Sequence, residues 1–231
     1  MDLPLTKECP HISIAMYYRY SLAELLPNLD KVIYLDSDLN VLTSLKALFN
    51  TDIADSYFGG VEDIFVQKNT ERLGINKYCN SGVILINLKK WRDENIQEKL
   101  YKFTIENKDR LVYPDQDVLN TVLQEGIKYI DKKWNAQVGE YKVCYDTGFN
   151  ELGKEAYIIH HIGQDKPWLL KSKSPFKGVY FKYLENTPFR NYKIKTYIIQ
   201  FLEEILSIKK TSAHIILSVL GIKLSIRIGK K

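Results

Sequence analysis

Two carboxylates stand two residues apart where an apolar segment ends. Residues 32–35 (VIYL) are β-branched, aromatic or aliphatic and lead directly into Asp36, Ser37 and Asp38. Two carboxylates held side by side repel one another unless a cation lies between them. Hard divalent cations take oxygen ligands, and phosphate oxygens can complete their shell. The triplet therefore suits half of a metal–diphosphate site, although the same spacing is common in solvated loop ends and helix caps.

A second segment carries complementary chemistry. The sequence HHIGQDKPW, residues 160–168, follows the apolar residues 157–159 (YII). An imidazole leaving a strand can bind a metal. Gly163 allows close backbone approach, and Lys166 offers a point charge for phosphate. The alternative is a core or surface histidine followed by an ordinary turn.

The elements that position these residues alternate between strand and helix. Apolar patterns predict strands at 31–36, 56–63, 82–87, 127–135 and 156–163, and helices at 12–29, 44–53, 88–107 and from 114 to 126. This alternation predicts an α/β domain with a largely parallel sheet, in which 31–36 is a buried parallel strand. Ligands of such sheets bind beyond the carboxyl ends of the strands, where Asp36, Asp38 and His160 fall.

Length and composition limit the possible classes of protein. The 231 residues suffice for one large domain, or one domain with an appendage. Three widely spaced cysteines argue against a disulfide framework and a cysteine zinc site, and predict reduced thiols. The apolar run at 213–222 is about half of the ~20 residues that a membrane-spanning helix needs. We therefore expect a soluble or surface-bound protein.

The positive charge gathers in the last part of the chain. From residue 190 onward there are nine basic and two acidic residues, whereas the rest of the chain is slightly acidic. Apolar residues recur at helical spacing from 194 to 206, and the pattern from 215 onward is ambiguous. We predict an α/β domain over 1–188 and a basic amphipathic tail over 189–231. The tail suits an anionic membrane surface, or packs on the domain; no nucleic-acid-binding module is present.

Four segments occur in an order that resembles glycosyltransferase family 8. They are LDSDLNV, YCNSGVILINLKKWR, PDQDVLN and HHIGQDKPW, and the resemblance covers about residues 12–170. The family contains glycogenin and the bacterial lipopolysaccharide galactosyl- and glucosyltransferases. The resemblance implies a GT-A fold, a Rossmann-like nucleotide-sugar domain. It also implies Mn²⁺-dependent retaining transfer, with Mg²⁺ as an alternative ion. The donor would be a UDP-hexose carrying glucose or galactose, and the acceptor a glycan, lipopolysaccharide or glycoprotein.

The resemblance also implies roles for individual residues. Asp36 and Asp38 match the family's metal ligands. His160 matches the third ligand, because the family pattern is His-x-x-Gly and Gly163 follows at that spacing. His161 should face away, since adjacent strand residues point to opposite faces. The implied donor-binding residues are Arg19, Asp36, Ser37, Asp38, Asn80, Ser81, Asp115, Gln116, His160, Gly163 and Lys166.

Three residues match positions at the reacting sugars, namely Asp63, Asp115 and Gln116. Two mechanisms remain open: covalent double displacement through Gln116, and front-face attack by the acceptor assisted by the departing phosphate. The second is an alternative because the Gln116 amide is a poor nucleophile. Simpler interpretations also stand: Arg19 as a surface arginine, Asp63 as a cap of the next segment and Asp115 as a helix N-cap.

The chain differs from the family pattern at its start. Family members begin with strands that bind uracil and ribose, and only 35 residues precede Asp36 here. We therefore expect a GT-A domain that lacks those strands. The alternative function is a catalytically impaired fragment or accessory subunit that binds a partner glycosyltransferase or a membrane. The expected location is the cytoplasm, with peripheral contact at the inner face of the membrane.

Overall fold

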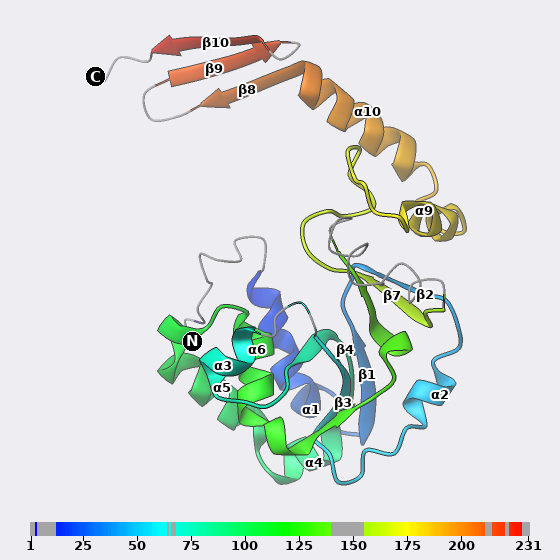
Figure 1. Cartoon of the computed structure of the whole chain (residues 1–231), viewed down its shortest axis with the longest axis vertical. Coiled ribbons are helices and arrows are strands. Elements are labelled where there is room, and N and C mark those ends of the chain that lie inside the picture. Colours follow the sequence, from blue (N-terminus) through cyan, green and yellow to red (C-terminus); the bar gives the residue numbers. More distant parts are fainter. Residues whose placement is uncertain are drawn as a thin grey trace. The chain divides into compact units, whose positions relative to one another are not determined.

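The computed structural model describes residues 3, 13–63, 65, 68–139, 155–210, 214–219 and 222–227 (Figure 1). The chain divides into two compact units, residues 1–137 with 151–160, and residues 138–150 with 161–231. The strands up to residue 161 are β1 (Lys31–Leu35), β2 (Leu39–Val41), β3 (Phe58–Glu62), β4 (Cys79–Asn87), β5 (Ile127–Tyr129), β6 (Ala136–Val138) and β7 (Ile158–His161). The α-helices described in the first unit are α1 (Leu22–Leu25), α2 (Lys46–Phe49), α3 (Lys68–Leu73), α4 (Leu88–Asp93), α5 (Ile96–Glu106) and α6 (Pro114–Val122).

The central sheet is mixed, so the expectation of a largely parallel sheet is wrong. Its strand order is β1-β4-β3-β5; β4 runs antiparallel to both β1 and β3, and only β3 and β5 pair in parallel. Strand–helix alternation describes how elements are connected, whereas pairing depends on which strands become neighbours. The strand β1 is half-buried at one edge of this sheet rather than fully buried.

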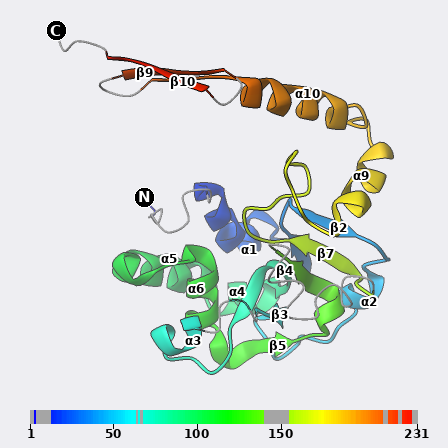
Figure 2. The same cartoon turned by 45° about the horizontal axis from the view of Figure 1, so that its top comes forward.

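Both faces of β4 are covered, which explains its continuous apolar sequence. Ile84 and Ile86 join a core with the helical side chains of Tyr17, Trp91 and Leu119. Val83 belongs to a second core on the opposite face, whose buried members include Leu48, Val61, Trp134 and Ile158. Figure 2 shows α5 and α6 on one side of the strands and β2 and β7 on the other. The sheet is therefore the middle layer of the first unit.

Part of each of two predicted elements is a 3₁₀ helix instead. The helix expected at 12–29 is a 3₁₀ helix over Ile14–Ser21, followed by α1. The strand expected at 127–135 ends at Tyr129, and a 3₁₀ turn over Lys132–Asn135 follows. The Asp131 side chain accepts a hydrogen bond from the backbone N–H of Lys133, which caps this turn. Two further 3₁₀ turns span Lys108–Arg110 and Gln124–Gly126.

The second unit contains the basic tail. Its helices within the described residues are α9 (Lys177–Glu185) and α10 (Tyr192–Ile205), and the latter confirms the predicted amphipathic helix. The apolar stretch that follows is not helical. It forms an antiparallel sheet of order β10-β9-β8, from β8 (Leu206–Lys210), β9 (His214–Val219) and β10 (Ile222–Arg227). None of the helices within the described ranges is long and apolar enough to cross a membrane.

The redox state predicted for the cysteines can be compared with the structure only at Cys79. Cys79 is a buried free thiol in β4. Burial raises the pKa of this thiol well above its ordinary value, with Asp63 as a further cause. A buried, protonated thiol is unreactive. Cys9 and Cys144 lie outside the described residues.

Candidate active site

The mixed sheet brings distant segments together at one end. Asp36 follows β1 and Asp63 follows β3, two strands that run in the same direction on either side of β4. Because β4 is antiparallel to both, its first residues lie beside their carboxyl ends. The backbone N–H of Asp36 accordingly donates to the carbonyl of Gly82 at 2.8 Å. Asn80 and Ser81 are therefore placed between the two aspartates.

Asp36, Asp38 and His160 form a compact group of potential metal ligands. The pairing of β2 with β7 sets Leu39 opposite His160, next to Asp38. His160 Nε2 lies 3.2 Å from Asp38 Oδ1 and 3.9 Å from Asp36 Oδ2. One potential ligand atom from each residue lies within 4.8 Å of the others. Two carboxylate oxygens and one imidazole nitrogen suit Mn²⁺ or Mg²⁺.

The space within this group exists because residue 82 is glycine. A Cβ atom on Gly82 would lie 2.1 Å from Cε1 and 2.8 Å from Nδ1 of His160, and 2.9 Å from Oδ2 of Asp36. These separations are far inside the ordinary contact distance of about 3.5 Å. The absent side chain thus leaves room for the His160 ring beside Asp36. The family resemblance implies roles for Asn80 and Ser81 and none for Gly82, so this glycine is a site residue that only the structure reveals.

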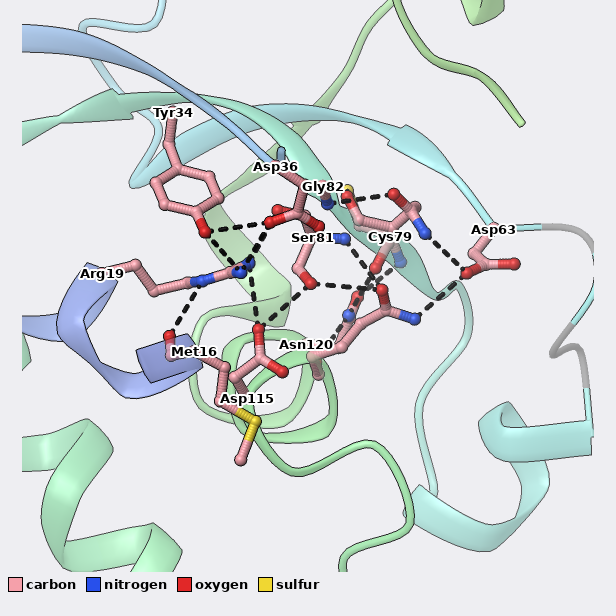
Figure 3. Close-up of polar contacts among 12 residues, drawn as sticks. Met16, Arg19, Tyr34, Asp36, Asp63, Cys79, Ser81, Gly82, Asp115 and Asn120 are labelled. Carbon is pink, nitrogen blue, oxygen red and sulfur yellow. Dashed lines mark hydrogen bonds and ion pairs between the residues drawn. The ribbon is translucent and has the colours of Figure 1, made fainter. Parts of the chain in front are cut away.

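Arg19 is buried between two carboxylates (Figure 3). Its guanidinium lies 3.0 Å from Asp36 Oδ1 and 2.9 Å from Asp115 Oδ2. It also donates to the hydroxyl of Tyr34 and to the carbonyl of Ser81, each at 2.8 Å. Burial opposes the charge, but Asp115 and Asp36 raise the pKa of the guanidinium. The interpretation of Arg19 as a surface residue is therefore wrong.

Tyr34 extends this contact set and was not predicted. Its hydroxyl donates to Asp36 Oδ1 at 2.9 Å, and the Arg19 guanidinium carbon lies 4.1 Å from the centre of its ring. Asp36 Oδ1 is therefore held by two donors, while Oδ2 faces His160. Within the apolar run VIYL, Tyr34 reads as a core residue. Its spacing of two residues from Asp36 places both side chains on the same face of a strand, which is the sequence signal for their contact.

The first turn of α6 presents Asp115 and Gln116 to β4. Ser81 donates its backbone N–H to Gln116 Oε1 at 2.9 Å and its hydroxyl to Asp115 Oδ2 at 3.2 Å. Asp115 is not the N-cap, because the helix is preceded by Tyr113 and the Asp115 side chain points to Arg19 and Ser81. Burial raises the pKa of the Asp115 carboxyl, which Arg19 partly offsets. Pro114 occupies the helix start, as predicted.

Neighbouring polar residues fix α6 against the sheet. Asn120 accepts from the backbone N–H of Cys79 at 2.6 Å and donates to its carbonyl at 2.8 Å, as a paired strand would. Asp117 accepts two hydrogen bonds of 2.8 Å from Arg72 and one from Tyr78. These contacts fix the position of α6 and thereby keep Asp115 and Gln116 next to Ser81.

Asp63 is a buried acceptor for two amides. Its Oδ2 accepts from Asn80 Nδ2 at 3.0 Å and from Gln116 Nε2 at 3.1 Å. Its Oδ1 accepts from the backbone N–H of Phe65 at 3.1 Å, so the capping alternative holds alongside these contacts. Burial raises the pKa of the Asp63 carboxyl, and the donated hydrogen bonds from Asn80, Phe65 and Gln116 act in the opposite direction.

The remaining predicted residues are Ser37, Gly163 and Lys166. Ser37 is exposed between the two aspartates. Gly163 and Lys166 belong to the second unit, where Gly163 has a φ of 72° and Lys166 Nζ donates to the carbonyl of His161. The ring of His161 packs edge-on against Tyr180, with centroids 6.2 Å apart.

Comparison with known proteins identifies relatives of this chain. The model of glycosyl transferase family 8 matches residues 5–172. General stress protein A of Bacillus subtilis is 33% identical over 78% of the chain and 68% of its own length. Lipopolysaccharide 1,3-galactosyltransferase of Salmonella typhimurium is 29% identical over 81% of the chain and 58% of its length. The chain spans only 51% and 43% of the lengths of two other bacterial relatives.

A solved structure has the same fold. The galactosyltransferase LgtC, in complex with donor and acceptor sugar analogues, superimposes with a TM-score of 0.68 at 29% identity. The match covers 80% of this chain and 71% of that protein. The predicted GT-A fold is thereby confirmed.

Proposed function

The chain belongs to glycosyltransferase family 8, and we propose that it transfers a hexose from a UDP-sugar to a glycan, lipopolysaccharide or glycoprotein acceptor with retention at the anomeric carbon. The observation that carries the proposal is the group formed by Asp36, Asp38 and His160, which suits a divalent cation. Glucose and galactose are the hexoses that the family resemblance favours. Mn²⁺ is the proposed ion, and Mg²⁺ would fit the same donor atoms.

These three side chains would hold the ion, which when bound would offset the negative charge that develops on the departing diphosphate. The protein's own contribution is to hold the ligands. Arg19 and Tyr34 fix Oδ1 of Asp36 and leave Oδ2 on the His160 side. Gly163 and Lys166 are proposed to bind the diphosphate oxygens, with Lys166 as a point charge.

The contacts of Gln116 favour front-face attack over a covalent intermediate. Its Oε1 already accepts a hydrogen bond of 2.9 Å from the backbone N–H of Ser81. An amide oxygen engaged in this way is a still weaker nucleophile. In the front-face reaction the sugar–phosphate bond breaks and its electron pair goes to the diphosphate. The acceptor oxygen then bonds to the anomeric carbon, and its proton passes to the departing phosphate. Asp115 and Gln116 would stabilise the positive charge on the sugar.

Titration of UDP into the purified chain tests this function. We expect binding in the presence of Mn²⁺ and loss of binding when EDTA removes the metal, because the diphosphate would be held through the cation. Asp38→Asn should weaken Mn²⁺-dependent UDP binding by at least about tenfold, since it removes one charged ligand. Isothermal titration calorimetry measures both, and hydrolysis or transfer assays with UDP-glucose and UDP-galactose follow.

Asp55→Asn is the matched control, because Asp55 is an exposed carboxylate of the first unit. It should leave UDP binding unchanged. Absence of metal-dependent UDP binding by a well-folded chain would contradict the proposed function and favour the accessory-subunit alternative.

A second proposal concerns the helix α10. Ile194, Ile198, Phe201 and Leu202 recur at helical spacing and are each more than half exposed. An apolar helix face in a basic segment suits an anionic lipid surface. We propose that this face docks the protein on the cytoplasmic leaflet of a membrane, near a lipid-linked acceptor.

Vesicle pelleting tests the docking proposal. The full chain should sediment with vesicles that contain anionic lipid and much less with neutral ones, because both charge and apolar burial contribute. Ile198→Ser combined with Phe201→Ser should reduce pelleting several-fold. Ile105→Ser, at an exposed apolar position of α5, is the control. Equal pelleting of the double variant and the original chain would refute docking through α10.

A further inference from the structure

His160 can bind a cation through Nε2 only if its proton sits on the other ring nitrogen. Nε2 faces Asp38 and Asp36, whereas Nδ1 lies 2.9 Å from Oδ1 of Asn135. A neutral imidazole carries one N–H, and the hydrogen bond at one nitrogen decides which tautomer is present. Asn135, only 1% exposed, is thus placed to make this choice. Its effect depends on which end of its amide faces the ring.

The orientation of the next amide, Asn80, is determined by two partners of fixed character. The backbone N–H of Gly82 can only donate, and it lies 3.0 Å from Asn80 Oδ1. Asp63 is a carboxylate that accepts, and its Oδ2 lies 3.0 Å from Asn80 Nδ2. Reversing the Asn80 amide would place its NH₂ against the Gly82 N–H and its oxygen against the carboxylate. Only the observed orientation satisfies both contacts.

The Asn80 oxygen then determines the orientation of Asn135. Asn80 Oδ1 also accepts from Asn135 Nδ2, at 2.8 Å. Since that contact requires a donor, the NH₂ end of Asn135 faces Asn80 and its oxygen faces His160 Nδ1. An oxygen there requires a proton on Nδ1. With a cation bound between Asp36, Asp38 and His160, Nε2 would be the unprotonated nitrogen and would direct its lone pair at the ion; without a cation, Nε2 can donate to Asp38 Oδ1.

We propose that Asn135 is a positioning residue that holds His160 in the Nδ1–H tautomer, and that Asp63 and the Gly82 N–H set this state through Asn80. The inference rests on the proposed metal-dependent function for its purpose. Its structural content, a proton held on Nδ1 by the Asn135 oxygen, is independent of that function. A proton on Nε2 would block the nitrogen that faces the two carboxylates.

The tautomer can be measured directly in metal-free protein. Nitrogen-15 spectra of imidazole-labelled protein distinguish Nδ1–H from Nε2–H through their shifts and couplings to ring protons. The spectra also distinguish a ring that carries a proton on one nitrogen from a ring that carries a proton on each. His160→Gln assigns the signal among the four histidines of the chain. We expect His160 to carry a proton on Nδ1, whether or not Nε2 also donates to Asp38 Oδ1.

Variants of Asn135 separate positioning from packing. Asn135→Leu removes the acceptor, so we expect the Nε2–H form to appear and Mn²⁺ affinity to fall by about ten- to a hundredfold. Asn135→Asp keeps an acceptor at Nδ1 and should retain the Nδ1–H signal, with Mn²⁺ affinity nearer to that of the original chain. Gln137→Leu also removes a buried amide, but one that donates to the Glu62 carbonyl, and should change neither readout.

The outcomes distinguish this inference from the proposed function. An unprotonated Nδ1 in the original chain, or an unchanged signal in folded Asn135→Leu, would overturn the inference. If Asn135→Leu does not fold, Asn135→Ser removes the same acceptor with a smaller side chain, and the spectrum of the original chain still decides. Absence of Mn²⁺ binding together with an Asn135-dependent tautomer would contradict the proposed function and leave the positioning role supported.

Discussion

Gly82→Ala should abolish Mn²⁺-dependent UDP binding in a protein that still folds. The added methyl carbon would lie 2.1 Å from Cε1 of His160 and 2.9 Å from Oδ2 of Asp36. The His160 ring is buried and hydrogen-bonded to Asn135. To make room for the methyl group, the ring must leave its position or β4 must move away from β1. Either change separates the three ligand atoms. Calorimetric Mn²⁺ affinity should fall by at least about a hundredfold, and crowding should cost about 1–3 kcal/mol of stability.

Gly59→Ala is a close control for this substitution. Gly59 lies in β3, the neighbouring strand, and a Cβ atom there would meet its nearest atoms at 3.4–3.6 Å. That variant adds the same methyl group to the same sheet without approaching the ligands. It should therefore keep Mn²⁺ binding. Equal Mn²⁺ affinity of Gly82→Ala and the original chain would show that the ligand group tolerates a methyl group at this position.

Arg19→Met should be among the most destabilising single substitutions in the first unit. Arg19 and Asp115 are both buried and their charges are 2.9 Å apart, with Asp36 as a second partner. Removing one partner of a buried pair leaves an uncompensated charge, which costs about 3–5 kcal/mol. Domains of this size are commonly stable by only about 5–15 kcal/mol. Urea unfolding followed by circular dichroism would measure the loss.

A second substitution and the pH dependence distinguish the unpaired charge of Asp115 from lost packing as the cause of this destabilisation. Arg19→Met with Asp115→Asn should be less destabilised than Arg19→Met, because the unpaired charge is gone. Lys89→Met removes an exposed ion pair with Asp93 and should have a much smaller effect. Equal destabilisation of the single and double Arg19 variants would refute the electrostatic explanation.

The pH dependence of Arg19→Met follows from the pKa of Asp115. Burial already raises the folded-state pKa of this carboxyl above its ordinary value, and losing Arg19 should raise it further. A raised folded-state pKa means that the folded protein binds the proton more tightly than the unfolded chain, so acid favours folding. The destabilisation should be full at neutral pH. It should decrease as the pH falls toward about 4, the ordinary value for aspartate.

The sequence by itself determined the local elements and the residue types of the site. The apolar run before Asp36 predicted β1, and Pro114 with the acidic residues after it predicted the start of α6. Apolar spacing from 194 to 206 predicted α10. Such signals act over a few residues, because helical and strand periodicity and helix caps depend on near neighbours. Four ordered segments also sufficed to identify the family.

Only the tertiary structure decided which of these residues meet. The antiparallel placement of β4 sets Asn80, Ser81 and Gly82 between Asp36 and Asp63, whereas strand–helix alternation favoured a parallel sheet. Arg19 and Asp115 are far apart in the chain, and neither one's local sequence indicates the other. Asn135 contacts His160 from a 3₁₀ turn within a segment that was predicted to be a strand. The physical reason is that strand pairing and buried polar contacts depend on the packing of distant segments, which local periodicity does not encode.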